Sequence, residues 1–188
     1  MENTLHSLPA LHLFQSLPIA PECSSSSHSQ VLNTLQLIER VEVPEISKWK
    51  RCRCFSLKVH WKSPQSQKQA TDLRMIRHAW RTNDQVDHCF AEFLTLREAV
   101  YKRAISSHGT ASCAFCASVL MFTGYALAQS RSLLPWFCSD DEFKNLISGF
   151  LNHMLKLILQ LGTFQEWECI GQRDIPLLIK NFLMDEFD

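Results

Sequence analysis

The sequence is short of glycine, and its charges cancel. Only 5 of its 188 residues are glycine, which argues against a loop-rich fold or a β-sandwich. Lys plus Arg and Asp plus Glu number 19 each, so the formal net charge is zero. A neutral chain gives no general reason to expect a polyanionic partner. We therefore expect neither nucleic acid nor an anionic membrane as a partner.

Enzyme signatures are also missing. We find no Gly-rich phosphate loop, no metalloprotease helix motif and no Ser-His-Asp order that can be defended. The first residues contain no basic region ahead of an apolar run, so a secretory signal is not expected. Without such a signal, the 8 cysteines are expected to be reduced thiols. The sequence thus predicts a non-enzymatic cytoplasmic protein without a cofactor.

One long stretch, residues 104–130, contains no Asp, Glu, Lys or Arg. A helix without a charged face belongs inside something, either a lipid bilayer or a bundle of other helices. Ser, Thr, Cys and Gly dilute its apolarity, and basic residues flank both ends, which weakens the membrane interpretation. We expect a buried central helix, and membrane association stays open.

The rest of the chain is arranged around this stretch. Pro and Ser punctuate residues 1–30, which are expected to be an irregular leader. A single helical domain over 31–188, with a loop at about 44–70, is expected to follow. Helical spacing and capping signals predict helices at 31–41, 71–81 and 84–106, after Ser139, after Thr163 and at 177–187. The predicted fold class is all-α, a bundle of six to eight helices around the hydrophobic central one.

The expected loop carries basic residues interleaved with tryptophans, such as Lys48, Trp49 and Trp61. Such a pattern can mark a nucleic-acid surface. Because Phe55 and Leu57 alternate with other residues, a solvated loop or an edge strand is the simpler interpretation. We prefer it, since a single patch is weak evidence in a neutral chain.

The cysteines raise the question of a metal. Cys113 and Cys116 form a Cys-x-x-Cys pair, and the further donors that could complete a zinc site are His88, Cys89, His108 and Cys138. A second group consists of Cys52, Cys54 and His60. Neither group has the paired spacing of a zinc finger, so we expect no metal and cysteines that pack as small apolar residues.

The second half, roughly residues 71–187, resembles the Bcl-2 family of apoptosis regulators. Ser107-His108-Gly109-Thr110 is similar to the first homology motif of that family, and Leu151-Asn152, followed later by Trp167, is similar to the second. Thr110 stands where the family has the arginine that pairs with an aspartate of the bound helix. The resemblance implies helices wrapped around a hydrophobic hub, and helix-in-groove binding.

The resemblance also implies a site and a partner. The partners would be pro-apoptotic Bcl-2 family proteins or their amphipathic helices, bound so as to inhibit cell death, with a localisation that could include the mitochondrial surface. Plain core packing is the alternative role for each groove residue. The groove candidates are Ile76, Trp80, Phe90, Phe93, Leu94, Val100, Tyr101, Gly109, Thr110 and Cys113.

Two other functions are consistent with the sequence. One is a zinc-stabilised helical accessory protein that uses some of the cysteines and histidines. The other is a helical adaptor that oligomerises through the apolar segment around Trp136 and Phe137, and a homodimer is also left open.

Overall fold

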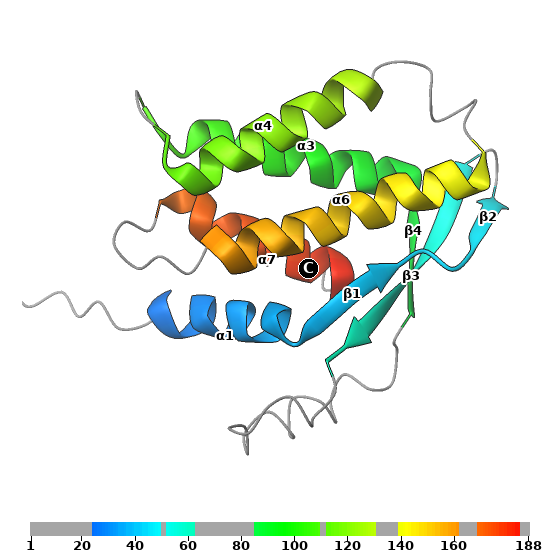
Figure 1. The fold of residues 1–188 in the computed structure, drawn as a ribbon, viewed down its shortest axis with the longest axis horizontal. Helices are drawn as coiled ribbons and strands as arrows, with labels where there is room; N and C mark the ends of the chain where they lie inside the picture. Colours follow the sequence, from blue (N-terminus) through cyan, green and yellow to red (C-terminus); the bar gives the residue numbers. More distant parts are fainter. Residues whose placement is uncertain are drawn as a thin grey trace, which may run out of the picture.

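The computed structural model of the chain describes residues 24–49, 52–62, 85–109, 112–130, 139–161 and 169–184. In these ranges, helices pack beside a four-stranded antiparallel sheet that lies at one end of the helical layers (Figure 1). The elements in chain order are α1 (Ser24–Gln36), β1 (Ile38–Glu42), β2 (Ile46–Trp49), β3 (Cys52–Trp61), β4 (Gln85–Cys89), α3 (Phe90–Ser106), α4 (Ala114–Ser130), α6 (Asp140–Leu161) and α7 (Ile170–Met184).

The sheet is organised around β3, which pairs antiparallel with each of the other three strands. Phe55 lies opposite both Ile46 of β2 and His88 of β4, so these two strands occupy opposite edges of β3. Lys58 lies between Glu42 of β1 and Gln85 of β4 in the same way, so β1 and β2 share one edge. The alternation read in the sequence is therefore that of a central strand, with Phe55, Leu57 and Val59 buried.

The sheet shows that the all-α prediction is wrong. Strands β2 and β3 occupy 46–49 and 52–61 of the segment expected to be a loop, and β1 and β4 occupy the ends of two segments expected to be helices. Short segments with apolar residues at both ends, such as 38–41 and 86–90, fit a helical stripe and a strand equally well. The pairing partner decides between them, and the pairing with β3 comes from residues far away in the sequence.

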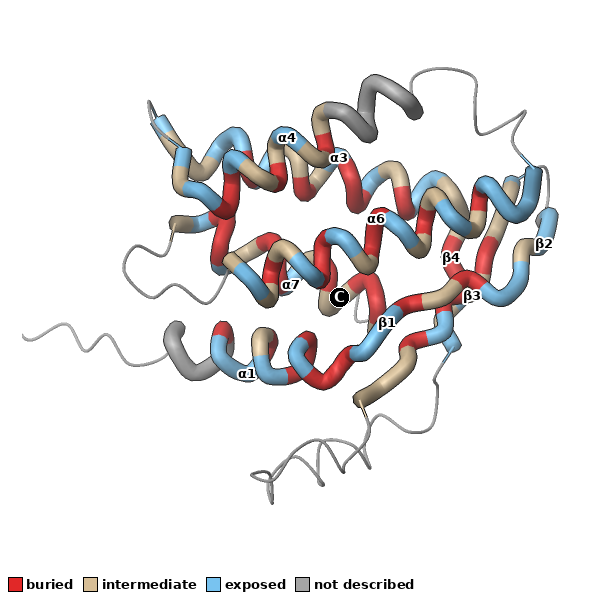
Figure 2. Tube along the Cα trace, in the orientation of Figure 1, coloured by how far each residue is buried: buried red, intermediate tan, exposed pale blue. Residues whose placement is uncertain are grey.

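The charge-free helix is not the hub that the sequence predicts. Phe115, Cys116, Val119 and Thr123 of α4 are buried, but Met121 on the other side is 78% exposed. In Figure 2, α4 lies at the outside of the helical layers, whereas α6 runs between α4 and the lower part of the molecule. None of the helices in the described ranges combines the length and apolarity that crossing a lipid bilayer requires.

Helix α6 instead holds the layers together. It is 22 residues long and begins with the capping box that the sequence predicts, in which the Ser139 N–H donates to Glu142 Oε2 at 2.8 Å. Its apolar stripe buries Phe143 and Phe150, which contact Phe55 of the sheet and Phe93 of α3, respectively, edge to face. This aromatic core joins the sheet to the helices.

A polar clamp fixes the position of β1 on α6. The Asn152 side chain accepts a hydrogen bond from the Val41 N–H at 2.9 Å and donates one to the Val41 carbonyl at 2.7 Å. Val41 lies in the outer strand of this edge, where its backbone groups would otherwise lack a strand partner. The Leu151-Asn152 motif therefore has a structural role at this edge.

Candidate metal centre

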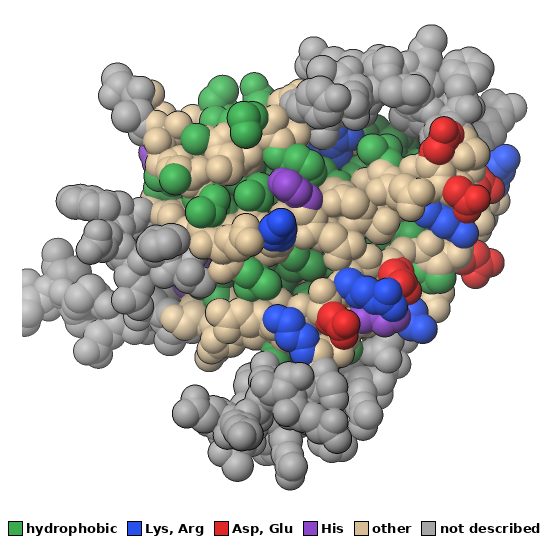
Figure 3. All heavy atoms as spheres, in the orientation of Figure 1, with side chains coloured by type: hydrophobic (Ala, Val, Ile, Leu, Met, Phe, Trp, Pro, Cys, Tyr) green, Lys and Arg blue, Asp and Glu red, His purple; other side chains and the backbone are tan. Residues whose placement is uncertain are grey.

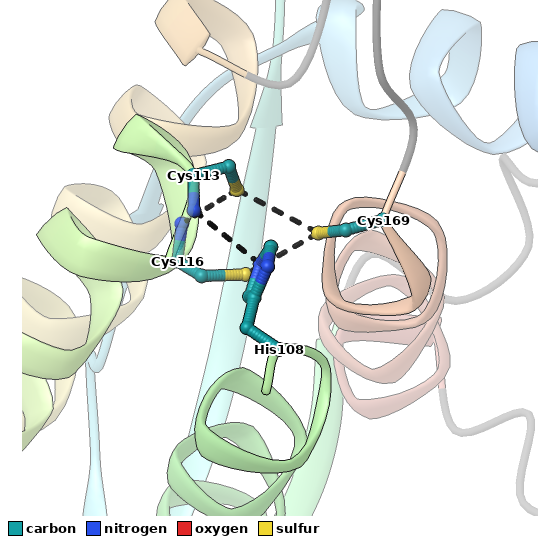
Figure 4. A group of neighbouring side chains, drawn as sticks. All are labelled: His108, Cys113, Cys116 and Cys169. Carbon is teal, nitrogen blue, oxygen red and sulfur yellow. Dashed lines mark hydrogen bonds between the residues drawn. The ribbon is translucent and has the colours of Figure 1, made fainter. Parts of the chain in front are cut away.

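Four side chains from three parts of the chain meet at one point (Figure 4). His108 lies just after the end of α3, Cys113 and Cys116 lie at the start of α4, and Cys169 immediately precedes α7. Their ligand atoms, one imidazole nitrogen and three sulfurs, all lie within 4.8 Å of one another. Cys116 is buried and the other three are partly exposed.

The spacing of the sulfurs is that of a tetrahedral zinc site. Cys169 Sγ lies 3.6 Å from Cys113 Sγ and 3.5 Å from Cys116 Sγ. Zinc–sulfur bonds of about 2.3 Å in tetrahedral geometry place two ligand sulfurs about 3.8 Å apart. Movements of a few tenths of an ångström would therefore bring these sulfurs into a coordination sphere.

Two helix N-termini are directed at the cluster. The Cys116 N–H points to Cys113 Sγ at 3.4 Å, and the Gln172 N–H points to Cys169 Sγ at 3.3 Å. Gln172 also accepts the Cys169 N–H through Oε1 at 3.1 Å, completing a capping box with sulfur as the capping atom. The positive end of a helix dipole and N–H···S bonds favour a thiolate over a thiol. Both caps thus prepare sulfur for binding a cation.

The Cys116 thiol nevertheless holds its proton while no cation is bound. Burial raises the pKa of Cys116 far above its ordinary value, and the adjoining sulfurs of Cys169 and Cys113 raise it further. Three thiolates crowded together would repel one another without a cation between them. A divalent cation reverses this balance and releases the protons on binding. The arrangement is therefore chemically suited to exchanging protons for a metal.

A glycine leaves room for the cluster. A Cβ on Gly171, in the first turn of α7, would lie 2.6 Å from Cys116 Sγ and 2.9 Å from Ser107 Oγ. Both distances are shorter than van der Waals contact, so no side chain fits at this position without displacing its neighbours. Gly171 thus allows the start of α7 to approach the ligands on α4.

The sequence named part of this centre. The Cys113–Cys116 pair and His108 are candidate ligands in the sequence and belong to the cluster. Cys169 is the ligand that the sequence does not predict. Cys169 stands alone, 53 residues beyond Cys116, so spacing does not reveal it. A local signal was present, because Cys169 and Gln172 have capping-box spacing just ahead of an apolar helix. A cysteine at a helix N-cap could therefore have been considered as a ligand.

The other candidate donors lie elsewhere. His88 is buried at the other end of α3, where its Nε2 lies 2.8 Å from the Phe182 carbonyl oxygen. Cys89 lies beside Cys54, and His60 pairs with Glu42. Cys138 is outside the described residues.

Five of the residues proposed for a helix-binding groove lie on α3, and they differ in burial. Phe93 and Val100 of α3 have no exposed surface, so in this conformation they pack in the core and offer nothing to a ligand. Cys113 belongs to the metal cluster. Phe90, Leu94 and Tyr101 are partly exposed along α3, and Gly109 is exposed after it, whereas Ile76, Trp80 and Thr110 lie outside the described residues.

Comparison with known proteins adds no relative. No family model, no curated protein and no solved structure matches the chain. The chemistry of the cluster itself is therefore the basis for a functional hypothesis.

Proposed function

We propose that this chain is a zinc-stabilised accessory protein, in which one structural Zn²⁺ is held by His108, Cys113, Cys116 and Cys169. The observation that carries the proposal is the convergence of these four donors within 4.8 Å. A chance cluster of small apolar cysteines would not need an imidazole at the same point, nor two helix N-termini directed at the sulfurs.

The donor set favours zinc and a structural role. Three thiolates with one imidazole suit zinc, whereas magnesium and calcium prefer oxygen ligands. Four protein ligands complete a tetrahedron and leave no open position for a water molecule or a substrate. The metal would therefore support the fold rather than perform chemistry, in line with the expectation of a non-enzymatic protein.

The place of the cluster explains what the metal would stabilise. It joins the end of α3 to the starts of α4 and α7, three helices that also pack against one another. Without the ion, these junctions depend on weak contacts between sulfurs, on the ion pair between Arg103 of α3 and Asp174 of α7, and on the packing of the helix bodies. Because the ligands must be reduced thiols, the proposal includes a reducing compartment such as the cytoplasm.

The fold differs from the one that the hypothesis of apoptosis regulation implied. The resemblance implied an all-α bundle around a buried hub, and the chain instead has a four-stranded sheet and a partly exposed α4. The binding of pro-apoptotic helices stays a prediction without support from the fold. The adaptor hypothesis depended on Trp136 and Phe137, which lie outside the described residues.

Chelation tests the stabilising role. The full chain, loaded with zinc, is heated in the presence and absence of a strong chelator while helix content is followed by circular dichroism. Loss of about 5 kcal/mol of zinc stabilisation would lower the unfolding midpoint by roughly 10–20 °C in a chain of this size. Re-addition of zinc should restore the midpoint. An unchanged midpoint after complete removal of the metal would overturn the structural role.

A further inference from the structure

A second pair of thiols lies far from the metal cluster. Cys54 of β3 and Cys89 of β4 are directly opposite each other in the antiparallel pair, and their sulfurs are 3.1 Å apart. Cys89 directly precedes α3, whereas His108 follows its end. The 17 residues of α3 separate the two places by about 25 Å, so the pair belongs to a different site.

The backbone already has the geometry of a disulfide. Directly opposite residues in antiparallel strands have Cα atoms about 4.5–5.5 Å apart, inside the range of about 4.4–6.8 Å found in disulfides. The sulfurs are closer than two non-bonded sulfurs ordinarily approach, and about 1 Å of side-chain movement would complete the bond. Both cysteines are partly exposed, so a small oxidant has access to them.

We propose that Cys54 and Cys89 are a redox modification site that forms a reversible cross-strand disulfide by exchange with glutathione disulfide. One protein thiolate attacks a sulfur of glutathione disulfide, which forms a mixed disulfide and releases one glutathione thiolate. The second protein thiolate then attacks the protein sulfur of the mixed disulfide and releases the second glutathione. The two protein thiols lose two protons and two electrons, and glutathione disulfide is reduced to two glutathione molecules.

The pKa of Cys89 affects how fast this thiol reacts at a given pH. The hydrogen bond with Cys54, followed by burial and nearby negative charge, raises the pKa of Cys89 to about 11. Cys89 is therefore protonated at neutral pH, and because the thiolate is the nucleophile, exchange should accelerate as the pH rises.

The disulfide would change how α3 is held. It would join the middle strand of the sheet to the residue that caps α3, while the zinc cluster holds the other end of the same helix. The Glu92 half of the capping box would survive, since Glu92 Oε2 accepts from the backbone N–H of Cys89 and not from its sulfur. The cross-link closes the chain between residues 54 and 89, which restricts the unfolded state and stabilises the fold.

Peptide mapping of the full, zinc-loaded chain tests the proposal. The protein is equilibrated in glutathione buffers from fully reduced to fully oxidised, quenched in acid, alkylated and digested. We expect a linked peptide pair that contains Cys54 and Cys89, a mass lower by 2 Da, full reversal by dithiothreitol and retention of the zinc. The equilibrium constant for unfolding in urea should fall by roughly two to three orders of magnitude on oxidation.

Matched variants separate this pair from general thiol oxidation. Cys52 is exposed on the same strand but lies opposite Trp49, so Cys52→Ser should leave the disulfide and its stabilising effect intact. Cys89→Ser should abolish both, and Cys54→Ser is the second variant if the first folds poorly. The proposal is overturned if excess glutathione disulfide gives only mixed disulfides, or links Cys113, Cys116 or Cys169 and leaves Cys54 and Cys89 alkylated. Because the products are located by peptide, this result is independent of whether zinc is bound.

Discussion

Replacement of Gly171 by alanine should weaken metal binding, although the position is not a ligand. The added Cβ would lie 2.6 Å from Cys116 Sγ and 2.9 Å from Ser107 Oγ. Ordinary contact needs about 1 Å more to the sulfur, so α7 or the ligand must move. Changes in the residues that position a metal ligand typically reduce metal affinity by about 10- to 100-fold, or about 1.4–2.7 kcal/mol. We expect a loss in this range for Gly171→Ala.

A second glycine provides the matched control. Gly149 lies in α6, and a Cβ there would meet nothing within 4 Å. Gly149→Ala should therefore leave zinc affinity unchanged and stabilise the protein by about 0.5–1 kcal/mol through the better helix propensity of alanine. The same gain acts at Gly171, where overpacking costs about 1–3 kcal/mol and should outweigh it.

The assay has two readouts. Competition with a chromophoric zinc chelator gives the metal affinity of each variant, and urea unfolding with and without zinc gives its stability. Gly171→Ala should lose more stability in the zinc-loaded protein than in the metal-free protein, because the clash involves a ligand. Wild-type zinc affinity in a stable Gly171→Ala variant would refute the reasoning. An equal loss of stability in the zinc-loaded and metal-free protein would also refute it, because the clash would then affect helix packing alone.

Three further predictions follow from the described residues. Asn152→Ala removes both hydrogen bonds to the Val41 backbone and should cost about 1–3 kcal/mol in urea unfolding; a cost below about 0.5 kcal/mol would show that the clamp is unimportant. Arg97 has no exposed surface, its guanidinium has no hydrogen-bond partner in the described part of the chain, and burial lowers its pKa. Its contacts with the rings of Phe93 and Phe150, each worth about 2 kcal/mol in a desolvated site, offset only part of what it costs to desolvate an ion and leave its N–H donors without acceptors, so Arg97→Met should stabilise the protein. A large destabilisation in thermal unfolding would reveal a bound anion or another acceptor. Zinc affinity should fall as the pH is lowered, because protons compete for the sulfurs and the raised pKa of Cys116 favours the thiol. In zinc titrations at pH 6, 7 and 8, the affinity should change by up to about tenfold per pH unit for each proton released. A zinc affinity that does not vary with pH would contradict thiolate ligation.

Local signals in the sequence predicted some elements well. Ser139 and Glu142 have capping-box spacing, and α6 begins there with the predicted apolar stripe. The alternation at Phe55 and Leu57 left an edge strand open as an alternative to the predicted loop, and the structure has a strand there, in the middle of the sheet. Both patterns depend on residues that are close together in the sequence, so they can be recognised before the fold is known.

Contacts between residues far apart in the sequence could not be predicted from such local patterns. Residues 38–41 fitted a helical stripe, but the pairing with 58–61 makes them a strand. The absence of charge in 104–130 suggested a buried hub, yet a helix with an exposed Met121 needs no charge to lie at the surface of the bundle. The all-α fold class followed from these helical patterns, and the Bcl-2 resemblance implied the same kind of bundle.

The candidate site also combines ligands that are close in the sequence with one that is distant. Cys113 and Cys116 are visible as a pair because they are three residues apart, and His108 is close enough to be considered with them. Cys169 joins them only because α7 packs with its N-terminus toward the start of α4. The fourth ligand therefore depends on tertiary packing, which explains why the sequence alone gave no complete metal site.

Native mass spectrometry of the full chain, purified with zinc in the medium and a reducing agent, tests the central claim most directly. The account predicts one Zn²⁺ per wild-type chain and per Cys52→Ser chain, and loss of the bound ion in Cys169→Ser, because Cys169 is the ligand supplied by the fold alone. A wild-type chain that is folded and free of metal, or a Cys169→Ser chain that retains zinc as tightly as the wild type, would contradict it.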